Sequence, residues 1–452
     1  MSACEVAAVV DAALGASLAT GDPVALEPYR LDGVAPRALV RPQTPEHVAR
    51  MLALAAERGW AVVPWGRGHG QGCGDVPRRY DVALSLRRLD AIPDLDADNL
   101  TVTAEAGISL GELTQRLGER HLVLPLALGD GERTLGGLIA ANRAGCKRLL
   151  YGDPRDLLLG LRVALPNGAL VRYGRKVIKN VAGYDMPKLY LGSQGLLGVV
   201  VEATFKVQPL PDREGVLIAG FSGGPDAARA AQALFRSALG PACLMLLLGR
   251  AVQSLRRYPG LDVPEGRAVL VVAFDGRSAA VQRQMADAGR VLLAQSATGV
   301  AELPALAAET AAMLEDAAHG LHPEQPRVVL RLGVLPTQVA DAMAQAVGTM
   351  NVPGTSFGAV GDYSAGRIDL LLTGEPHIGW ERLDGRIHEL RRAMGERGGS
   401  VVLAAAPRSL KAKVGVWGDL QGAGRIMQRI KAQLDPRQVL SPGRFLPDPA
   451  EG

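Results

Sequence analysis

Cysteine, histidine and aromatic residues are scarce in this chain. Its 452 residues include 4 cysteines and 7 histidines, and only 4% are aromatic. The cysteines lie far apart, and no two of them have the spacing of a metal site or a redox motif; they are Cys4, Cys73, Cys146 and Cys243. We therefore expect no disulfide framework, no zinc ribbon, no iron–sulfur cluster and no other bound metal.

Neither sign of charge dominates, and long apolar runs are missing. The chain holds 50 Lys and Arg against 46 Asp and Glu, a net charge of +4, without the basic stripe typical of nucleic-acid binding. Glu5 and Asp11 interrupt the apolar start, unlike a signal peptide. The run 242–248 is far shorter than the ~20 residues that cross a bilayer. We expect a cytoplasmic protein that binds no nucleic acid and reaches the inner membrane, as a peripheral protein, only through partners.

What the chain does contain is an α+β pattern in two parts. From about 38 to 211, short apolar strands alternate with helices, one of which begins at Thr44-Pro45, an N-cap followed by proline at the first helical position. From about 215 to 406, strands alternate with alanine-rich helices, which predicts an antiparallel sheet with helices on one face. We expect an N-terminal helical segment at 1–35 and further units at 36–211, 212–410 and 411–452.

A glycine-rich loop follows the strand expected at 61–65. Gly66, Gly68, Gly70 and Gly72 alternate with larger residues, which lets successive N–H groups point into one concavity suited to phosphate. The loop is neither the dinucleotide fingerprint G-x-G-x-x-G nor a P-loop. Its spacing alone leaves two interpretations open, an anion-binding nest and a flexible turn.

Two other patterns have ordinary explanations. The segments 107–111 and 220–224 match the hydrolase elbow G-x-S-x-G, but each also marks the start of a helix. Ser109 and Glu112 form a predicted capping box, which accounts for the first segment. His319 and His322 precede Pro323 without a third ligand at a recognisable spacing, so we expect a solvated helix end there.

The stretch from 128 to 209 is the richest in motifs. Small residues in GDGERTLGGLIAAN, at 129–142, offer backbone against which a flat ligand could lie. YGDPRD at 151–156, KNVAGYD at 179–185 and GSQGLLGVV at 192–200 complete the series.

In this order, together with PWGRGHGQG and the tail LDPRQVLSPGRF, the motifs resemble the PCMH-type FAD-binding domain of the vanillyl-alcohol oxidase superfamily. Within it they are most similar to the FAD-binding subunits of bacterial glycolate oxidase (glycolate dehydrogenase) complexes. The resemblance covers about 36–211 and the tail from about 411, and is weak in between. It implies an α+β fold with a split FAD-binding domain at 36–211, completed by a returning segment at 411–452. The intervening 212–410 would be a cap domain of antiparallel sheet flanked by helices.

The resemblance also implies a set of FAD-binding residues. The loop would hold the pyrophosphate, the small residues after 128 would line the flavin and its ribityl chain, and backbone at 198–200 and the tail would contact the cofactor. The set is Gly66, Arg67, Gly68, His69, Gly70, Gly129, Asp130, Thr134, Gly136, Gly137, Asn142, Gly198, Val199, Val200, Ser441 and Arg444. Ser441 stands where the family usually has asparagine.

His69 leaves the mode of FAD attachment open. Related oxidases bind FAD covalently through a histidine of this loop, whereas the glycolate oxidase branch mostly carries a small hydroxyl residue there and binds FAD non-covalently. In sister subunits, a histidine-rich stretch of the cap holds the hydroxy acid through a metal. Here His377 and His388 stand alone, which favours an accessory role.

The function implied is oxidation of a small 2-hydroxy acid, or relay of its electrons through FAD, beside a catalytic FAD subunit and an iron–sulfur subunit. No catalytic residue is assigned. The alternatives are a self-sufficient oxidase with FAD attached at His69 and a non-catalytic scaffold subunit.

Overall fold

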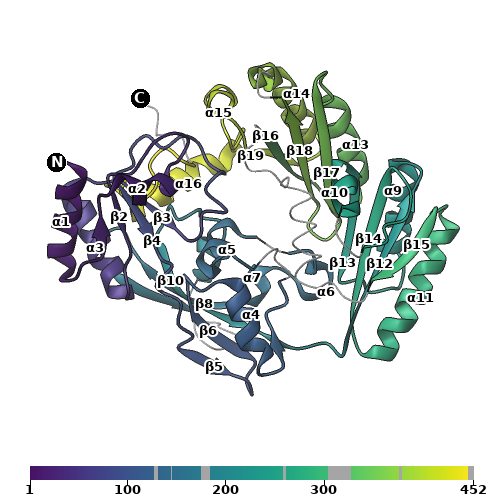
Figure 1. Ribbon diagram of the computed structural model, residues 1–452, viewed down its shortest axis with the longest axis horizontal. Coiled ribbons are helices and arrows are strands. Elements are labelled where there is room, and N and C mark those ends of the chain that lie inside the picture. Colours follow the sequence, from purple (N-terminus) through teal and green to yellow (C-terminus); the bar gives the residue numbers. More distant parts are fainter. Residues whose placement is uncertain are drawn as a thin grey trace.

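The structure is a computed structural model that describes residues 1–126, 131–143, 145–174, 184–257, 261–303, 327–375 and 379–445. Two halves face each other across the middle of the molecule (Figure 1). The first half holds a four-stranded, a five-stranded and a two-stranded sheet with the N-terminal helix, and the second holds one eight-stranded sheet with its helices.

The first sheet has the order β1-β2-β4-β3, with β1 at Ala19–Thr20, β2 at Ala38–Val40, β3 at Val62–Trp65 and β4 at Val82–Ser85. β2 and β3 both run parallel to β4. The helices α1 (Ala3–Leu14) and α3 (Pro45–Arg58) pack together beside this sheet. Thr44 caps α3 by accepting a hydrogen bond from His47 N–H, as its sequence predicts.

The second sheet is antiparallel, with the order β5-β6-β10-β8-β9. Its strands are β5 (Asp94–Asp96), β6 (Thr101–Glu105), β8 (Leu158–Ala164), β9 (Leu170–Gly174) and β10 (Val199–Lys206). The turn residues Pro166-Asn167-Gly168 predict a hairpin between two apolar strands, and β8 and β9 form it. The helices α4 (Leu110–Gly118) and α5 (Leu135–Ala141) begin at Ser109 and Thr134, whose hydroxyls cap them. Ser109 is therefore a helix cap and not a hydrolase nucleophile elbow.

Short elements lie in the connections between the strands of the first half and on the way to the second half. They are α2 (Pro23–Leu26), α6 (Arg148–Tyr151), α7 (Pro154–Leu157), α8 (Pro187–Tyr190) and the strand pair β7 (Leu122–Val123) and β11 (Gln208–Pro209).

The second half is one eight-stranded sheet whose strand pairs are all antiparallel. Its order is β15 (Gly299–Leu303), β12 (Arg213–Phe221), β14 (Ala268–Gly276), β13 (Cys243–Gly249), β17 (Thr355–Asp362), β18 (Arg367–Gly374), β16 (Arg327–Gly333) and β19 (Ser400–Ala405). The antiparallel sheet predicted for 215–406 is confirmed.

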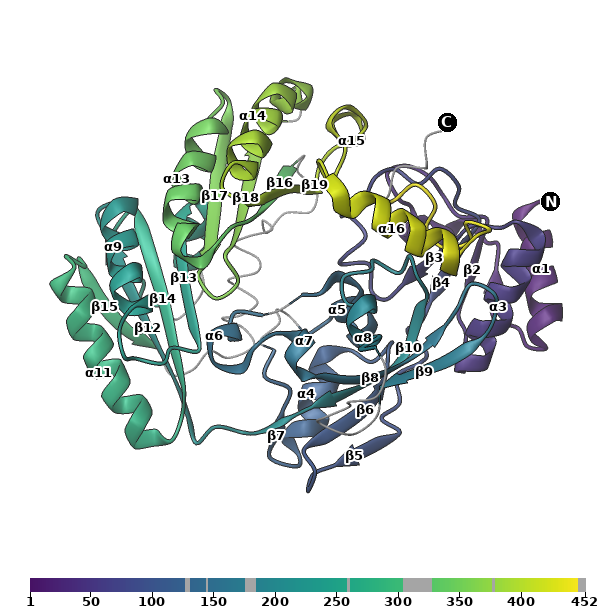
Figure 2. The ribbon, with the colours of Figure 1, turned by 180° about the vertical axis from the view of Figure 1, so that it is seen from behind.

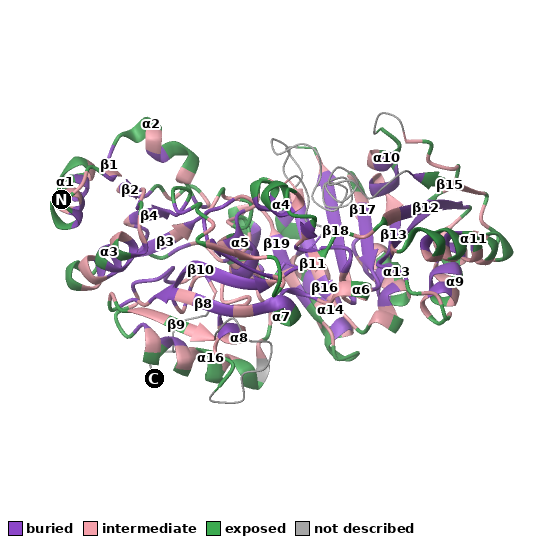
Figure 3. Ribbon diagram, turned by 90° about the horizontal axis from the view of Figure 1, so that it is seen from below, coloured by how far each residue is buried: buried purple, intermediate pink, exposed green. Residues whose placement is uncertain are grey.

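Alternation along the strands separates the two faces of this sheet. Leu217, Ala219 and Phe221 belong to the core beneath the helices, whereas Val216 and Ile218 pack on the opposite face. The helices on the first face are α9 (Gly224–Phe235), α11 (Ser278–Ala294), α13 (Val339–Thr349) and α14 (Asp384–Gly395), and α10 (Arg250–Arg256) packs on the other. Purple strands flanked by helices with green outer surfaces show this layering (Figure 3).

The C-terminal segment returns to the first half of the molecule. After β19 come α15 (Arg408–Val414) and α16 (Gln421–Leu434), and α16 lies beside the first sheet (Figure 2). Leu440 then pairs with Val62 in a parallel bridge, with Val62 N–H donating to Val439 O at 2.7 Å and Ser441 N–H donating to Val62 O at 3.0 Å. The tail thus adds to the strand that leads directly into the glycine-rich loop.

Candidate functional site

A cavity of about 690 Å³ lies where the glycine-rich loop, the second sheet, the tail and the large sheet come together. The first half contributes the loop at 63–73 and several residues of 133–143 and of 193–200 to the walls of this cavity. Strands β16 and β19 contribute residues from the other side, and Trp417 and the tail close one end. The volume is within the range of ordinary ligand and cofactor sites, ~300–1,000 Å³.

Most of the expected FAD-binding residues line this one cavity. They are Gly66, Arg67, Gly68, His69, Gly70, Thr134, Gly136, Gly137, Gly198, Val199, Val200, Ser441 and Arg444. Asn142 does not line it and instead ends α5 in the left-handed conformation, with φ +46°. Gly129 and Asp130, and the part of the KNVAGYD motif at 179–183, lie outside the described residues.

At three positions of the cavity wall, a glycine lies so close to a neighbouring residue that a side chain would collide with it. A Cβ at Gly66 would collide with Thr134 Oγ1, the hydroxyl that accepts a hydrogen bond from Gly137 N–H. A Cβ at Gly136 would lie 2.9 Å from Ala106 Cβ, and one at Gly198 would lie 2.6 Å from Val163 Cγ1. Small residues are therefore required here by packing as well as by access to a ligand.

The glycine-rich loop is folded by its own short-range hydrogen bonds. Gln71 N–H donates to Gly68 O at 3.0 Å, and Cys73 N–H donates to Gly70 O at 3.2 Å. The Gln71 side-chain amide donates to Pro64 O at 2.8 Å. Gly68 has φ +90°, a conformation that favours glycine. Within the described part of the chain, the N–H groups of Gly68 and Gly70 donate to no backbone carbonyl, so they remain available to an anion.

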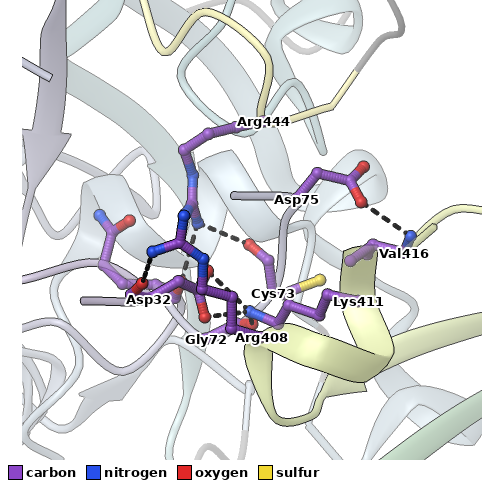
Figure 4. Close-up of polar contacts among 9 residues, drawn as sticks. Asp32, Gly72, Cys73, Asp75, Arg408, Lys411, Val416 and Arg444 are labelled. Atoms are coloured by element: carbon purple, nitrogen blue, oxygen red, sulfur yellow. Dashed lines mark hydrogen bonds and ion pairs between the residues drawn. The ribbon is translucent and has the colours of Figure 1, made fainter. Parts of the chain in front are cut away.

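Two cations hold the carbonyl groups at the end of this loop. Arg444 Nη2 donates to Gln71 O and to Cys73 O, each at 2.8 Å. Lys411 Nζ donates to Gly72 O at 2.9 Å and to both carboxylate oxygens of Asp32, at 2.9 and 3.0 Å (Figure 4). Sequence reasoning placed Arg444 at the cofactor but missed Lys411 and Asp32. No local pattern links Lys411 with Gly72, 339 residues away, or with Asp32, 379 residues away.

The cavity is strongly cationic. Six arginines line it, and none of its described lining residues is Asp or Glu; the six are Arg67, Arg133, Arg143, Arg327, Arg331 and Arg444. Arg67 forms an ion pair with Glu132, and Arg331 Nε contacts Asp369 Oδ1 at 2.8 Å. Burial lowers the pKa of Arg327 and of Arg444, but arginine remains protonated at neutral pH. Such a site suits an anionic ligand.

The second half contributes to the cavity through one face of β16. Arg327, Val329 and Arg331 alternate along the strand and line the cavity, while Val328, Leu330 and Leu332 pack beneath the helices. The two guanidiniums therefore belong to the sheet face that meets the glycine-rich loop. The sequence did not single them out, because two arginines in an apolar strand carry no motif.

The described residues contain no cluster of three or more His, Cys, Asp or Glu side chains suited to a metal ion. His388 lies on α14, away from the cavity lining, and His319, His322 and His377 fall outside the described residues. Across that same described part, no helix is both long and apolar enough to span a membrane.

The donor set fits a flavin dinucleotide. The N–H groups of Gly68 and Gly70 and the positive charge of the arginines suit the pyrophosphate, and the glycine-lined wall gives a flat ring system close access to backbone. Comparison with known proteins agrees, since residues 36–174 match the model of an FAD binding domain. Residues 210–402 match that of the C-terminal domain of FAD linked oxidases.

This chain belongs to the FAD-linked oxidases.

This FAD-linked oxidase is similar to several individual proteins. It is 27% identical to the glycolate oxidase subunit GlcD of Bacillus subtilis (strain 168), over 91% of this chain and 89% of that protein. It is 31% identical to the D-lactate dehydrogenase of Anaerostipes hadrus, over 62% of this chain and 60% of that protein. The fold is similar to that of p-cresol methylhydroxylase with substrate bound, with a TM-score of 0.74 at 17% identity, covering 98% of this chain and 96% of that one.

Proposed function

We propose that this FAD-linked oxidase is an FAD-binding subunit of a glycolate or related 2-hydroxy-acid dehydrogenase. The observation that carries the proposal is the cationic cavity, walled by glycine-rich backbone on one side and by Arg327 and Arg331 on the other. The names of the relatives from Bacillus subtilis and Anaerostipes hadrus support a 2-hydroxy acid as substrate. The division proposed is an FAD-binding domain at 36–211, a cap at 212–410 and a returning segment at 411–452, after an N-terminal segment at 1–35.

In this proposal, different residues of the chain bind different parts of FAD and of the substrate. Gly66–Gly70 would hold the pyrophosphate, and Thr134, Gly136, Gly137 and Gly198–Val200 would line the flavin. When bound, FAD supplies an acceptor for the hydride that leaves the substrate carbon. Arg327 and Arg331 would bind the substrate carboxylate, since guanidinium pairs strongly with carboxylate. Their shared position on β16 would then orient the hydroxyl-bearing carbon toward the first half.

We further propose that electrons pass to an iron–sulfur partner, with a catalytic FAD subunit in the same complex. The support is that the relative from Bacillus subtilis is by name a subunit. A self-sufficient oxidase with FAD attached at His69 is the second candidate, favoured by the position of His69 in the cavity wall. In a scaffold role, the chain would bind FAD, but this FAD would neither accept electrons from the substrate nor pass them to a partner.

The deciding experiment begins with the absorbance spectrum of the purified chain, followed by acid precipitation. Flavin released into the supernatant supports non-covalent FAD, and flavin kept in the pellet supports attachment at His69. Anaerobic addition of glycolate or D-lactate should then bleach the flavin. A flavin that stays oxidised with both acids, yet is reduced by dithionite, would refute oxidation of these acids by this chain itself and leave the electron-relay and scaffold roles.

Arg327→Met tests the substrate side of the proposal. Loss of one charged hydrogen-bond donor should raise KM for the hydroxy acid about tenfold or more, with FAD content unchanged. Arg290→Met, on the exposed side of α11, is the matched control and should behave as wild type. An unchanged KM in Arg327→Met would remove this residue from the substrate site.

A further inference from the structure

Three consecutive carbonyl groups of the glycine-rich loop face two cations from distant parts of the chain. Arg444 of the tail binds Gln71 O and Cys73 O, and Lys411 of α15 binds Gly72 O between them. The contacts are 2.8 to 2.9 Å long. Figure 4 shows Arg444 and Lys411 together with the loop residues that they contact.

Both cations are buried and well held. Lys411 is 2% exposed, and its ion pair with Asp32 compensates its charge. Arg444 is 6% exposed and packs on Gly74, where a Cβ would lie 2.8 Å from Arg444 Nη2. The backbone of Arg444 is fixed as well, because its carbonyl accepts hydrogen bonds from Asp75 N–H at 2.8 Å and from Trp417 Nε1 at 3.1 Å.

The planar peptide gives these contacts a consequence for the loop. In a trans peptide the N–H points opposite to the C=O, so anchoring a carbonyl also sets the direction of the next residue's N–H. Anchoring Gln71 O thereby turns the Gly72 N–H to the other side of the chain. Charge-assisted hydrogen bonds also polarise these peptides, which strengthens their N–H groups as donors to an anion.

We propose that Lys411 and Arg444 are positioning residues for the diphosphate of FAD. They orient and polarise the loop's peptides, and they act through Gln71, Gly72 and Cys73. The proposal rests on the proposed function, since it assumes that this loop holds the pyrophosphate. It gives α15, which follows directly on the large sheet, a part in cofactor binding.

The test compares FAD with riboflavin, which carries the same ring system without a diphosphate. Dissociation constants of both flavins are measured by fluorescence on the apo-protein, for wild type, Lys411→Met, Asp32→Asn and Lys413→Met. Lys413 is the matched control, because it lies on the same helix, is half exposed and pairs with Asp384. Thermal midpoints of the four apo-proteins are recorded beside them.

Lys411→Met should lower the preference for FAD over riboflavin about tenfold, the effect of losing one charged hydrogen bond. Asp32→Asn should lower the thermal midpoint but keep the preference, because Lys411 can still reach Gly72 O. Lys413→Met should change neither quantity. If Lys411→Met fails to fold, the double variant Lys411→Met, Asp32→Leu removes both buried charges and should show the same loss of preference.

Two results would overturn the inference. The first is an unchanged preference in Lys411→Met, or in the double variant, and the second is an equal loss in Asp32→Asn, which would show that the ion pair alone matters. A wild-type protein that binds FAD no better than riboflavin would overturn the proposed diphosphate site as well. The two proposals can therefore fail separately.

Discussion

At the scale of the residue, the thiol of Cys73 is a chemical probe of the cavity. Its side chain belongs to the cavity lining, and burial raises the pKa of its thiol despite the nearby charges of Arg331, Arg444 and Lys411. A raised pKa means less thiolate at neutral pH and slower alkylation. Of the other thiols, Cys4 is exposed, and Cys146 and Cys243 are buried.

We expect iodoacetamide at pH 7.5 to modify Cys4 quickly and Cys73 slowly in the apo-protein, with FAD blocking the slow reaction. Raising the pH should accelerate the Cys73 reaction, because more of its raised-pKa thiol ionises. Peptide mass spectrometry at timed intervals measures both rates, and Cys73→Ser identifies the slow site. Equal rates at Cys73 with and without FAD would place the cofactor elsewhere.

At the scale of the element, α16 is held by an unusual contact. Most of its described side chains are exposed or partly exposed, including Ile426 at 62%, while Lys431 is 5% exposed. Lys431 Nζ pairs with Asp435 and donates to Leu196 O and Leu440 O, both at 2.9 Å. A buried cation thus joins the helix to the cavity loop at 192–200 and to the tail.

Lys431→Met should destabilise the apo-protein by about 3–5 kcal/mol, because it leaves Asp435 buried without a counter-charge. Arg425→Met, on the exposed side of the same helix, should change stability by less than about 0.5 kcal/mol. Urea unfolding followed by tryptophan fluorescence measures both. Equal unfolding midpoints for the two variants would show that α16 is held by other contacts.

At the scale of the whole molecule, a buried cluster joins the two halves. Lys147, from the segment before α6, contacts Glu214 Oε1 at 2.5 Å and Asp275 Oδ2 at 2.8 Å, on β12 and β14. Tyr151 donates to the same oxygen of Asp275 at 3.0 Å. The Asp275 side chain is 1% exposed, so its charge depends on these partners.

Lys147→Met should therefore cost about 3–5 kcal/mol and lower the thermal midpoint by several degrees. Lys188→Met, which breaks a more exposed pair with Asp185, should cost less than about 1 kcal/mol. Calorimetry of the apo-proteins makes the comparison. The double variant Lys147→Met, Asp275→Asn should recover part of the loss, and no recovery would argue against an electrostatic cause.

The sequence by itself determined the local features of this protein. Caps such as Thr44, the hairpin at 158–173, the strand pattern of the large sheet and the motif residues around Gly66 and Thr134 depend on near neighbours in the chain. Backbone sterics, hydrogen-bond capping and side-chain periodicity act over a few residues, so they can be read from the sequence. The FAD family followed from the order of these motifs.

Only the tertiary structure decided which distant groups meet. It brought Lys411 to the carbonyl of Gly72, set Arg327 and Arg331 opposite the glycine-rich loop, and left Asn142 off the cavity wall. These contacts join segments separated by hundreds of residues and carry no periodic or local signal. Their geometry depends on how two separately patterned halves pack together, with buried charges compensated across the boundary, and that packing is a property of the folded chain.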